Sequence, residues 1–418
     1  MSRQPRHTLA ARILARLDQL AAVTGMPGEI TRLYLTRDHK AAVALVSGWM
    51  TEAGMAVSLD AAGTVVGRVE GTARAAKTLL IGSHIDSVRN AGRYDGCLGV
   101  VQAIEAVAEL RRLGKQLPYA IEVLAFGDEE GVRFSKTLTG SHAIAGGLEK
   151  AALDVVDADG TSIGEALRAF GCDPAAIGAV ARKASDVLGY VEVHIEQGPV
   201  LEEEGLAIGV VTAISGACRF QIEVHGKAGH AGTLPMPMRR DALTAAAEMV
   251  LAIEAIAKVT AGLVATVGQI AVVPGAVNAV PGQAAFTLDI RSPMDRTRRN
   301  GVLEIEKQLK SIARRRHITV KVVETYNEKA VTCDQRLIRH FTEAADRIGV
   351  PSIGLPSGAG HDGLAVSKLC PIGMLFVRCK GGVSHHPDES VKADDVEIAT
   401  RVLLEFLDQL SPNGRTLA

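Results

Sequence analysis

The chain has 418 residues, which is enough for two domains and a large core. Its 46 Lys and Arg residues nearly balance its 47 Asp and Glu residues, and a net charge of -1 argues against a nucleic-acid-binding protein. Only 3% of the residues are aromatic, so platforms on which bases stack are not expected either. A hydrophobic fraction of 47% is typical of a globular protein.

The cysteines and the apolar segments bear on the cellular compartment. Six scattered cysteines without a CxxC pair favour reduced thiols over a disulfide framework or an all-cysteine zinc site. Residues 1–7 lack the apolar region of a signal peptide. The most apolar helical tract, residues 242–267, is interrupted by Glu248, Glu254 and Lys258, which excludes a transmembrane span there. We therefore expect a cytoplasmic protein without a membrane partner.

The first two hundred residues alternate between helical and strand patterns, which predicts α/β architecture. Helices are expected over 8–23, 37–54 and 97–113, and an Ala-rich helical region over about 137–182. Strands are expected near 57–70, 78–84, 121–127 and 188–194.

The strand at 78–84 ends in His84 and is followed by Asp86, and Asp95 precedes the helix at 97–113. In open α/β sheets, ligands bind at the carboxyl ends of the strands. Imidazole and carboxylate groups are the usual nitrogen and oxygen ligands of zinc and manganese. An HxD pair by itself is more often a hydrogen-bonded pair than a pair of metal ligands.

The later strands end in the same way. The next apolar run ends in three adjacent carboxylates, Asp128, Glu129 and Glu130. Adjacent carboxylates repel one another unless a cation lies among them, although a solvated acidic turn is the simpler explanation for one such run. Two further apolar runs lead to His194 and to His385. Four strands that each lead to a His or carboxylate cluster indicate a metal site.

The pattern changes after Gly209. Two strands, a helix over 239–259, two strands, a helix over 295–315 and a final strand predict a compact α+β unit of about 115 residues. Ligand-like residues resume at His361, so this unit is an insertion. We expect a catalytic domain formed by residues 1–212 and 328–418, and an inserted domain formed by residues 213–327.

Together, the motifs HxD, GxYDG, EEG, HIEQG, AGHAGT, VPG, DIR, SGAGHD and SHHP resemble those of the amidase/hydantoinase/carbamoylase family. This family belongs to the di-metal superfamily of zinc aminoacylases and carboxypeptidases, and the resemblance runs from about residue 20 to the end of the chain. It implies a di-zinc peptidase-like catalytic domain with an inserted ferredoxin-like domain that serves as a lid and in dimerisation.

The resemblance also implies two divalent metal ions per chain. His84 and His194 would bind one ion, Glu130 and His385 the other, and Asp95 would bridge the two. The ligand set fits zinc or manganese and does not choose between them. His386 follows His385 where many members have Asn, which leaves two candidates for that ligand, and the match of Ser384 and His385 to the family favours His385.

Two acidic residues near the ligands have other implied roles. Asp86 would accept a hydrogen bond from the far nitrogen of His84, which fixes the imidazole tautomer. Glu129 would be the general base.

Five residues match substrate contacts of the family: Gln197, Arg219, His230, Asn278 and Arg291. In relatives, the His at position 230 reaches across a dimer to the substrate carbonyl oxygen, so a homodimer is implied. Asn278 and Arg291 match residues that hold the substrate carboxylate, and Arg219 matches a further Arg of allantoate-cleaving members. A surface charge at Arg291 and a turn residue at His230 are the structural alternatives.

His194 within HIEQG is typical of the branch that cleaves ureido groups, and it argues against a peptidase or aminoacylase. We expect an amidohydrolase that acts on a small ureido acid, with allantoate as the favoured substrate and ammonia and carbon dioxide as products. An N-carbamoyl-L-amino acid hydrolase or a β-ureidopropionase is the alternative. A catalytically inactive scaffold is not supported, because Glu129 and every ligand are present.

Overall fold

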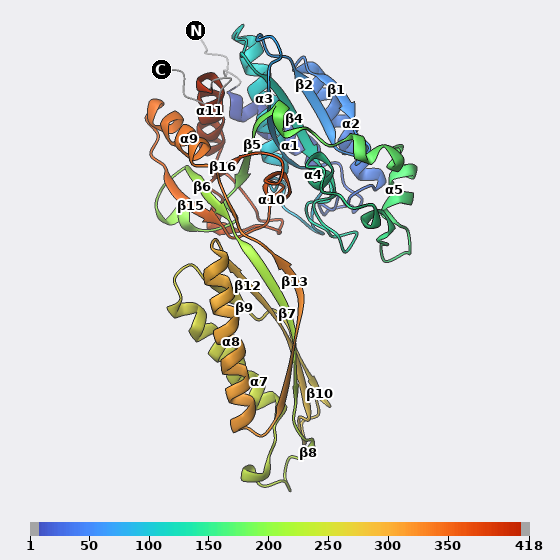
Figure 1. Cartoon of the computed structure of the whole chain (residues 1–418), viewed down its shortest axis with the longest axis vertical. Helices are drawn as coiled ribbons and strands as arrows, with labels where there is room; N and C mark the ends of the chain where they lie inside the picture. The colour runs from blue at the N-terminus through green and yellow to red at the C-terminus, as the bar shows by residue number, and fades with distance from the viewer. Residues whose placement is uncertain (1–7, 411–418) are drawn as a thin grey trace. The chain divides into compact units, whose positions relative to one another are not determined.

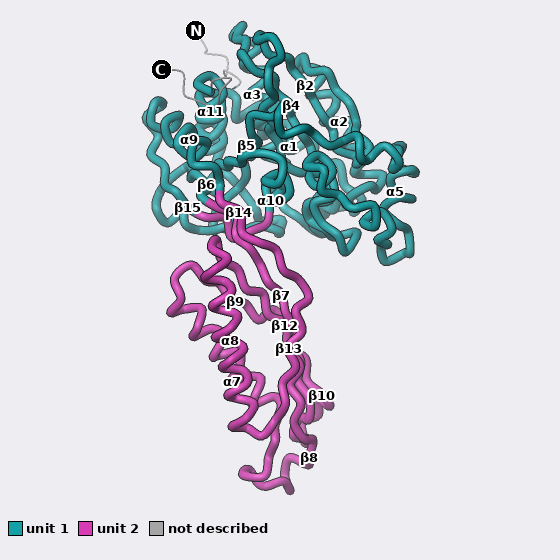
Figure 2. Tube along the Cα trace, in the orientation of Figure 1, with its two compact units in different colours: residues 1–212, 333–355, 361–418 teal, residues 213–332, 356–360 magenta. Residues whose placement is uncertain are grey.

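The computed structural model describes residues 8–410 (Figure 1). The chain forms two compact units (Figure 2). In the described part, unit 1 comprises residues 8–212, 333–355 and 361–410, and unit 2 comprises residues 213–332 and 356–360. Residues 1–7, on which the expected absence of a signal peptide depends, lie outside the described residues. No helix between residues 8 and 410 is long and apolar enough to cross a membrane.

Unit 1 contains a mixed sheet with the strand order β1-β2-β4-β3-β5-β16-β6, and β15 also pairs with β6. The strands are β1 (Ala56–Leu59), β2 (Val65–Val69), β3 (Thr78–His84), β4 (Ala120–Phe126), β5 (Val187–Ile195), β6 (Ile208–Ile214), β15 (Ile353–Ser357) and β16 (Ile372–Val377). The central strands β4, β3, β5 and β16 are parallel to one another, whereas β2 and β6, which flank them, are antiparallel. Every residue of β3, β4 and β16 is buried, as expected for the parallel core of an α/β sheet.

Helices surround this sheet. They are α1 (Leu9–Ala21), α2 (Arg37–Glu52), α3 (Cys97–Arg112), α4 (Thr139–Ile144), α5 (Ile163–Phe170), α6 (Val200–Glu203), α9 (Gln335–Arg347), α10 (Gly363–Val366) and α11 (Ala393–Gln409). Helix α3 packs against β3 and β5, and α11 packs against α1 and α9. The region 137–182 is helical only in short segments, because Gly146 and Gly171 adopt positive φ values of 72° and 100° directly after α4 and α5.

Unit 2 contains an antiparallel sheet with the strand order β10-β12-β7-β13. Its elements are β7 (Gly216–His225), β8 (Gly229–His230), α7 (Ala242–Val259), β9 (Val264–Thr266), β10 (Ile270–Val273), β11 (Ala279–Val280), β12 (Gln283–Ser292), α8 (Asp295–Arg315), β13 (Thr319–Glu328) and β14 (Val331–Thr332). Both long helices cover one face of the sheet (Figure 1), where apolar residues such as Phe220 and Met249 form a core. When β9 and β10, which both pair with β12, are counted as one interrupted strand, the order β-α-β-β-α-β matches a ferredoxin-like unit.

Two details of unit 2 differ from the sequence prediction. The strand expected over 262–273 consists of two strands, β9 and β10, which pair with opposite ends of β12. The unit also continues to Thr332 rather than residue 327, because β14 pairs with Ala213 and Ile214.

Candidate metal centre

The four central parallel strands bring the predicted ligands to one edge of the sheet of unit 1. His84 is the last residue of β3, and His194 is the penultimate residue of β5. Glu129 and Glu130 follow β4, and the segment after β16 leads to His385. Because the carboxyl ends of parallel strands meet at one edge, these residues lie together although up to about three hundred positions separate them in sequence.

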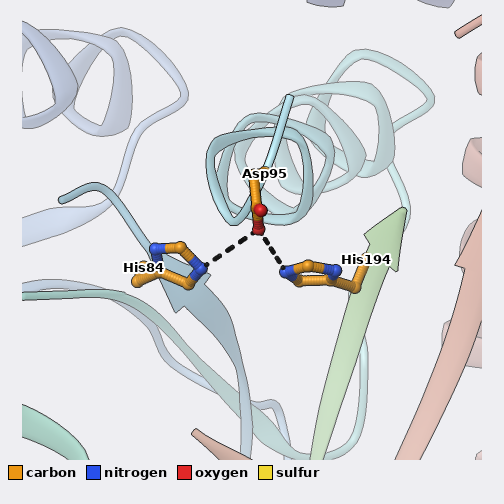
Figure 3. A group of neighbouring side chains, drawn as sticks. All are labelled: His84, Asp95 and His194. Atoms are coloured by element: carbon orange, nitrogen blue, oxygen red, sulfur yellow. Dashed lines mark ion pairs between the residues drawn. The ribbon is translucent and has the colours of Figure 1, made fainter. Parts of the chain in front are cut away.

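Asp95 lies at the centre of this group (Figure 3). Its Oδ1 atom is 3.1 Å from Nε2 of His194 and 3.6 Å from Nε2 of His84. Its Oδ2 atom is 3.2 Å from Nε2 of His385, and the same nitrogen is 3.6 Å from Oε2 of Glu130. The two carboxylate oxygens of Asp95 therefore face two different sets of donors.

These distances define two groups that could each hold a metal ion. His84, Asp95 and His194 form one, and Asp95, Glu130 and His385 form the other; in each, the candidate ligand atoms lie within 4.8 Å of one another. Three imidazoles with carboxylates are a donor set that suits a transition-metal ion such as zinc or manganese. A carboxylate shared by both groups fits a pair of ions.

The charges at the site also fit a cation. Burial, followed by the charge of Glu130, raises the pKa of Glu129 well above its usual range despite the opposing effect of His84. Burial and the charge of Asp95 raise the pKa of Glu130 to about 7. Burial disfavours the charged form of Asp95, but hydrogen bonds with His194 and the other two histidines hold its pKa well below the usual value. The neighbouring carboxylates thus destabilise one another, and a bound cation would relieve this repulsion.

The tautomers of the histidines follow from their backbone contacts. Nδ1 of His84 lies 3.1 Å from the carbonyl oxygen of Asp86, and Nδ1 of His194 lies 2.9 Å from the carbonyl oxygen of Ile195. Because a carbonyl can only accept, each Nδ1 carries a proton, which leaves Nε2 as the nitrogen that faces the centre and would bind a metal ion.

Asp86 acts differently from what the sequence predicted. Its carboxylate is 3.6 Å from Nδ1 of His84, farther than its own carbonyl oxygen. The two carboxylate oxygens instead accept hydrogen bonds, each of 3.2 Å, from the backbone N–H groups of Glu129 and Glu130. The side chain of Asp86 therefore holds the acidic turn in place, and its backbone orients His84.

Several residues at the site adopt unusual backbone conformations. Asp128, Gln197 and His385 have φ values of 67°, 57° and 56°, in a region that side chains other than glycine rarely occupy. Gly96 has a φ of 63°, and a Cβ atom there would lie 2.4 Å from the ring of His84. Such strain concentrates at functional sites, where the surrounding structure compensates for it.

The structure places other sequence candidates around the centre. Gln197, which was expected to bind substrate, donates from Nε2 to Oδ2 of Asp95 at 2.8 Å and to Oγ of Ser384 at 3.0 Å. The side chain of His386 is 58% exposed, and its Nδ1 accepts a hydrogen bond from the backbone of Asp388, whereas Nε2 of His385 faces Asp95. Of the two adjacent histidines, His385 is thus the one at the centre.

A third group of possible ligands comprises Glu192, His194 and His361. The rings of His194 and His361 are 4.5 Å apart, in an edge-to-face arrangement. Both nitrogens of His194 already face other partners, Asp95 and the Ile195 carbonyl, so His194 cannot serve a further ion. We therefore interpret Glu192 and His361 as packing partners of His194 and not as ligands of a third metal ion.

Sequence reasoning missed one buried acid at the centre. Glu389, which is 3% exposed, accepts hydrogen bonds from the backbone N–H groups of Tyr94 and Asp95. An acidic residue in a polar loop carries no signal for burial, so only the fold reveals this contact.

The remaining substrate-binding candidates lie in unit 2, in two places. Arg219 on β7 and Arg291 on β12 both donate to the carboxylate of Asp289, at 3.0 and 2.8 Å. His230 on β8 pairs with β11, where Ala231 donates a hydrogen bond of 2.9 Å to the carbonyl oxygen of Asn278.

Comparisons with known proteins match nearly the whole chain. A sequence model of Peptidase family M20/M25/M40 matches residues 80–409. The chain is 41% identical to an N-carbamoyl-L-amino acid amidohydrolase of Geobacillus stearothermophilus. The alignment extends over 401 residues and covers 96% of this chain and 98% of the relative. It is 40% identical over 431 residues to allantoate deiminase 1 of Glycine max, with 95% and 89% covered. A crystal structure of an amidase of the hydantoinase/carbamoylase family from Burkholderia multivorans matches with a TM-score of 0.91 and 34% identity over 98% of each chain.

Proposed function

Because this chain belongs to peptidase family M20/M25/M40, we propose that it is a metal-dependent amidohydrolase that cleaves the ureido carbon–nitrogen bond of a small carboxylate substrate. Relatives of about 40% identity over nearly the whole chain bear the names of two such activities. The predicted resemblance to the amidase/hydantoinase/carbamoylase family is confirmed. Allantoate is the substrate that we favour.

The observation that carries the proposal is the position of Asp95 between two donor groups. His84 and His194 would hold one divalent ion, Glu130 and His385 the other, and Asp95 would bridge them. Zinc and manganese both suit these donors. When bound, such ions supply Lewis acidity, which makes water a stronger nucleophile and polarises a carbonyl oxygen.

Glu129 is the proposed general base. It lies at the edge of the centre with its side chain 12% exposed and its Oε2 4.0 Å from Nε2 of His84, and neither donor group includes it. Its carboxylate would accept the proton of the attacking water as the new carbon–oxygen bond forms. It would then return that proton to the leaving nitrogen as the carbon–nitrogen bond breaks and ammonia departs. The remaining carbamate would decompose to carbon dioxide and an amine.

The substrate-binding candidates of unit 2 are too far apart to contact one small substrate. Arg291 pairs with Ala217 at one end of the β7–β12 ladder, and Gln283 pairs with His225 at the other. Strand β8, which contains His230, lies beyond that second end (Figure 1). At about 3.3 Å per residue, the eight residue steps from Gln283 to Arg291 span roughly 26 Å. His230 and Asn278 would therefore serve a different active site from Arg219 and Arg291.

In a homodimer, the two separated sets of residues in unit 2 could serve the active sites of two different subunits. In it, His230 of one subunit would stabilise the developing oxyanion in the active site of the other, while Arg291 would bind the substrate carboxylate in a bidentate manner. Unit 2 also exposes apolar side chains on α7, on the strand β9 next to it and on the edge strand β10, at Leu251, Val259, Val264 and Ile270. An exposed edge strand beside apolar surface favours pairing with a second copy. The inserted unit would thus act in dimerisation and as a lid.

The cytoplasm is the proposed compartment. All six cysteines are unpaired, and five of them are buried, which suits a reducing environment.

The proposal that allantoate is the preferred substrate can be tested by comparing kcat/KM among substrates. Allantoate carries a second ureido group, and Arg219 would supply a polar partner for it. A site with polar groups for this purpose leaves them unpaired when an alkyl side chain replaces the ureido group, which lowers kcat/KM by several orders of magnitude. In ammonia-release assays, we expect kcat/KM to be higher for allantoate than for N-carbamoyl-methionine and N-carbamoyl-alanine. The 41% identical relative favours an N-carbamoyl-L-amino acid hydrolase as the second candidate, and a preference for either carbamoyl amino acid would establish it.

A further inference from the structure

We propose that Glu389 is a positioning residue that locks the segment containing Asp95 to the segment containing His385, and that metal affinity depends on this lock. The inference rests on the metal centre of the proposed function. Asp95 and His385 stand in loops outside the regular strands, at positions where the sheet itself does not fix the side chain. Some other contact must hold these two segments together.

Glu389 makes that contact with both of its carboxylate oxygens. Oε1 accepts hydrogen bonds from the backbone N–H groups of Tyr94 and Asp95, at 2.8 and 3.1 Å. Oε2 lies 3.2 Å from Oγ of Ser384, the residue before His385. Asp95 and Glu389 are 294 positions apart in sequence, so one side chain joins two distant segments.

Ser384 completes the connection to the bridging carboxylate. Its Oγ is 2.9 Å from Oδ2 of Asp95, so the single hydroxyl proton lies between the carboxylates of Asp95 and Glu389. Oδ2 is also the oxygen that faces His385. Glu389 therefore constrains Asp95 twice, through its backbone and through the hydroxyl that contacts its side chain.

The surroundings of Glu389 are fitted to the carboxylate. A Cβ atom on Gly92 would lie 2.3 Å from the carboxyl carbon of Glu389, so only glycine leaves room for it. The backbone N–H of Glu389 donates to the carbonyl oxygen of His386 at 3.0 Å, which closes the turn that directly follows His385. A second buried carboxylate beside Asp95 is electrostatically unfavourable, and a role in holding the ligands explains its presence.

The test compares metal affinities of the full-length protein by calorimetric titration with Zn²⁺, with the visible absorption of bound Co²⁺ as a second readout. Glu389→Ala should bind Zn²⁺ about 10–100-fold more weakly, the usual effect of losing a group that orients a ligand. Glu389→Gln should bind Zn²⁺ with nearly wild-type affinity. Its amide oxygen can accept hydrogen bonds from both backbone N–H groups, and its amide nitrogen can donate one to Ser384. Gly92→Ala should displace the carboxylate of Glu389 without removing it. This variant should therefore lose Zn²⁺ affinity as Glu389→Ala does, and its Co²⁺ spectrum should change.

Glu105→Ala is the matched control. Glu105 is also buried, and it pairs with Arg12 and Arg16 on α1, away from the ligands. This variant should lose stability while it keeps its Zn²⁺ affinity and Co²⁺ spectrum. Unchanged affinity in Glu389→Ala, equal losses in Glu389→Ala and Glu389→Gln, or an equal loss in Glu105→Ala would each overturn the inference. Wild-type protein that binds no Zn²⁺ would instead contradict the proposed function, and this inference with it.

Discussion

Glu129 and Glu130 are adjacent in sequence, yet they lie near different histidines. Glu130 is 3.6 Å from His385 and belongs to a donor group, whereas Glu129 is 4.0 Å from His84 and belongs to none. Their substitutions should therefore have different effects. Glu129→Gln should lower kcat by about 10²–10⁴-fold while the protein retains its metal, because the amide cannot accept a proton. Glu130→Gln should lose metal.

The measurement is kcat for ammonia release together with metal content after gel filtration. Near-normal kcat in Glu129→Gln would show that another group is the base. A parallel loss of metal in that variant would make Glu129 a ligand.

At the scale of single residues, the sequence predicted the types of group at the site better than their contacts. The positions of His84 and His194 follow from apolar strands with polar ends, and the structure brings both to Asp95. The contacts of Gln197 and Glu389 with Asp95 join segments far apart in sequence, and no local pattern encodes them. They depend on how the loops fold over the sheet edge.

Helix α3 offers a comparison of two glycines at the scale of one element. Gly96 precedes its first residue and Gly114 follows its end, with φ values of 63° and 68°. A Cβ atom on Gly96 would lie 2.4 Å from the ring of His84, whereas a Cβ atom on Gly114 meets nothing within 4 Å. Both Gly→Ala variants should lose about 1–3 kcal/mol of stability from backbone strain.

Only Gly96→Ala should also bind metal more weakly and lose activity, because it displaces His84. Thermal unfolding measures the common effect, and Zn²⁺ titration measures the difference. Equal metal affinities in the two variants would show that the position of His84 does not depend on Gly96.

The regular elements were predictable where one pattern dominated. The fully buried strands β3 and β4 and the amphipathic α1 were assigned to within two residues of the observed bounds. Helices α9 and α11 were not predicted, although Leu337, Phe341 and Ala344 on α9 share one buried face. The Ala-rich region 137–182 suggested one helical stretch, and its glycines divide it into short segments. Alanine content signals helix, but turn residues decide where a helix ends.

At the scale of the whole molecule, the proposed homodimer can be tested by complementation. His230→Ala and Glu129→Gln chains should each be inactive as homodimers. After subunit exchange, a heterodimer has one site with an intact Glu129 from one chain and an intact His230 from the other. Random exchange should therefore restore about a quarter of the wild-type sites, since half of the dimers are mixed and each has one competent site.

The measurement is ammonia release before and after exchange, with mass spectrometry as proof that mixed dimers form. A mixture of two active-site-intact chains that differ only in a tag controls for losses during exchange. No recovery in proven heterodimers would place His230 in the active site of its own chain.

The most direct test of the central claim is ammonia release from allantoate as metal is returned to chelated protein. The account requires two ions per chain, because Asp95 presents one oxygen to each of two donor groups. Chelated protein should be inactive, and Zn²⁺ or Mn²⁺ should restore activity up to two ions per chain. Full activity in rigorously metal-free protein would contradict the account.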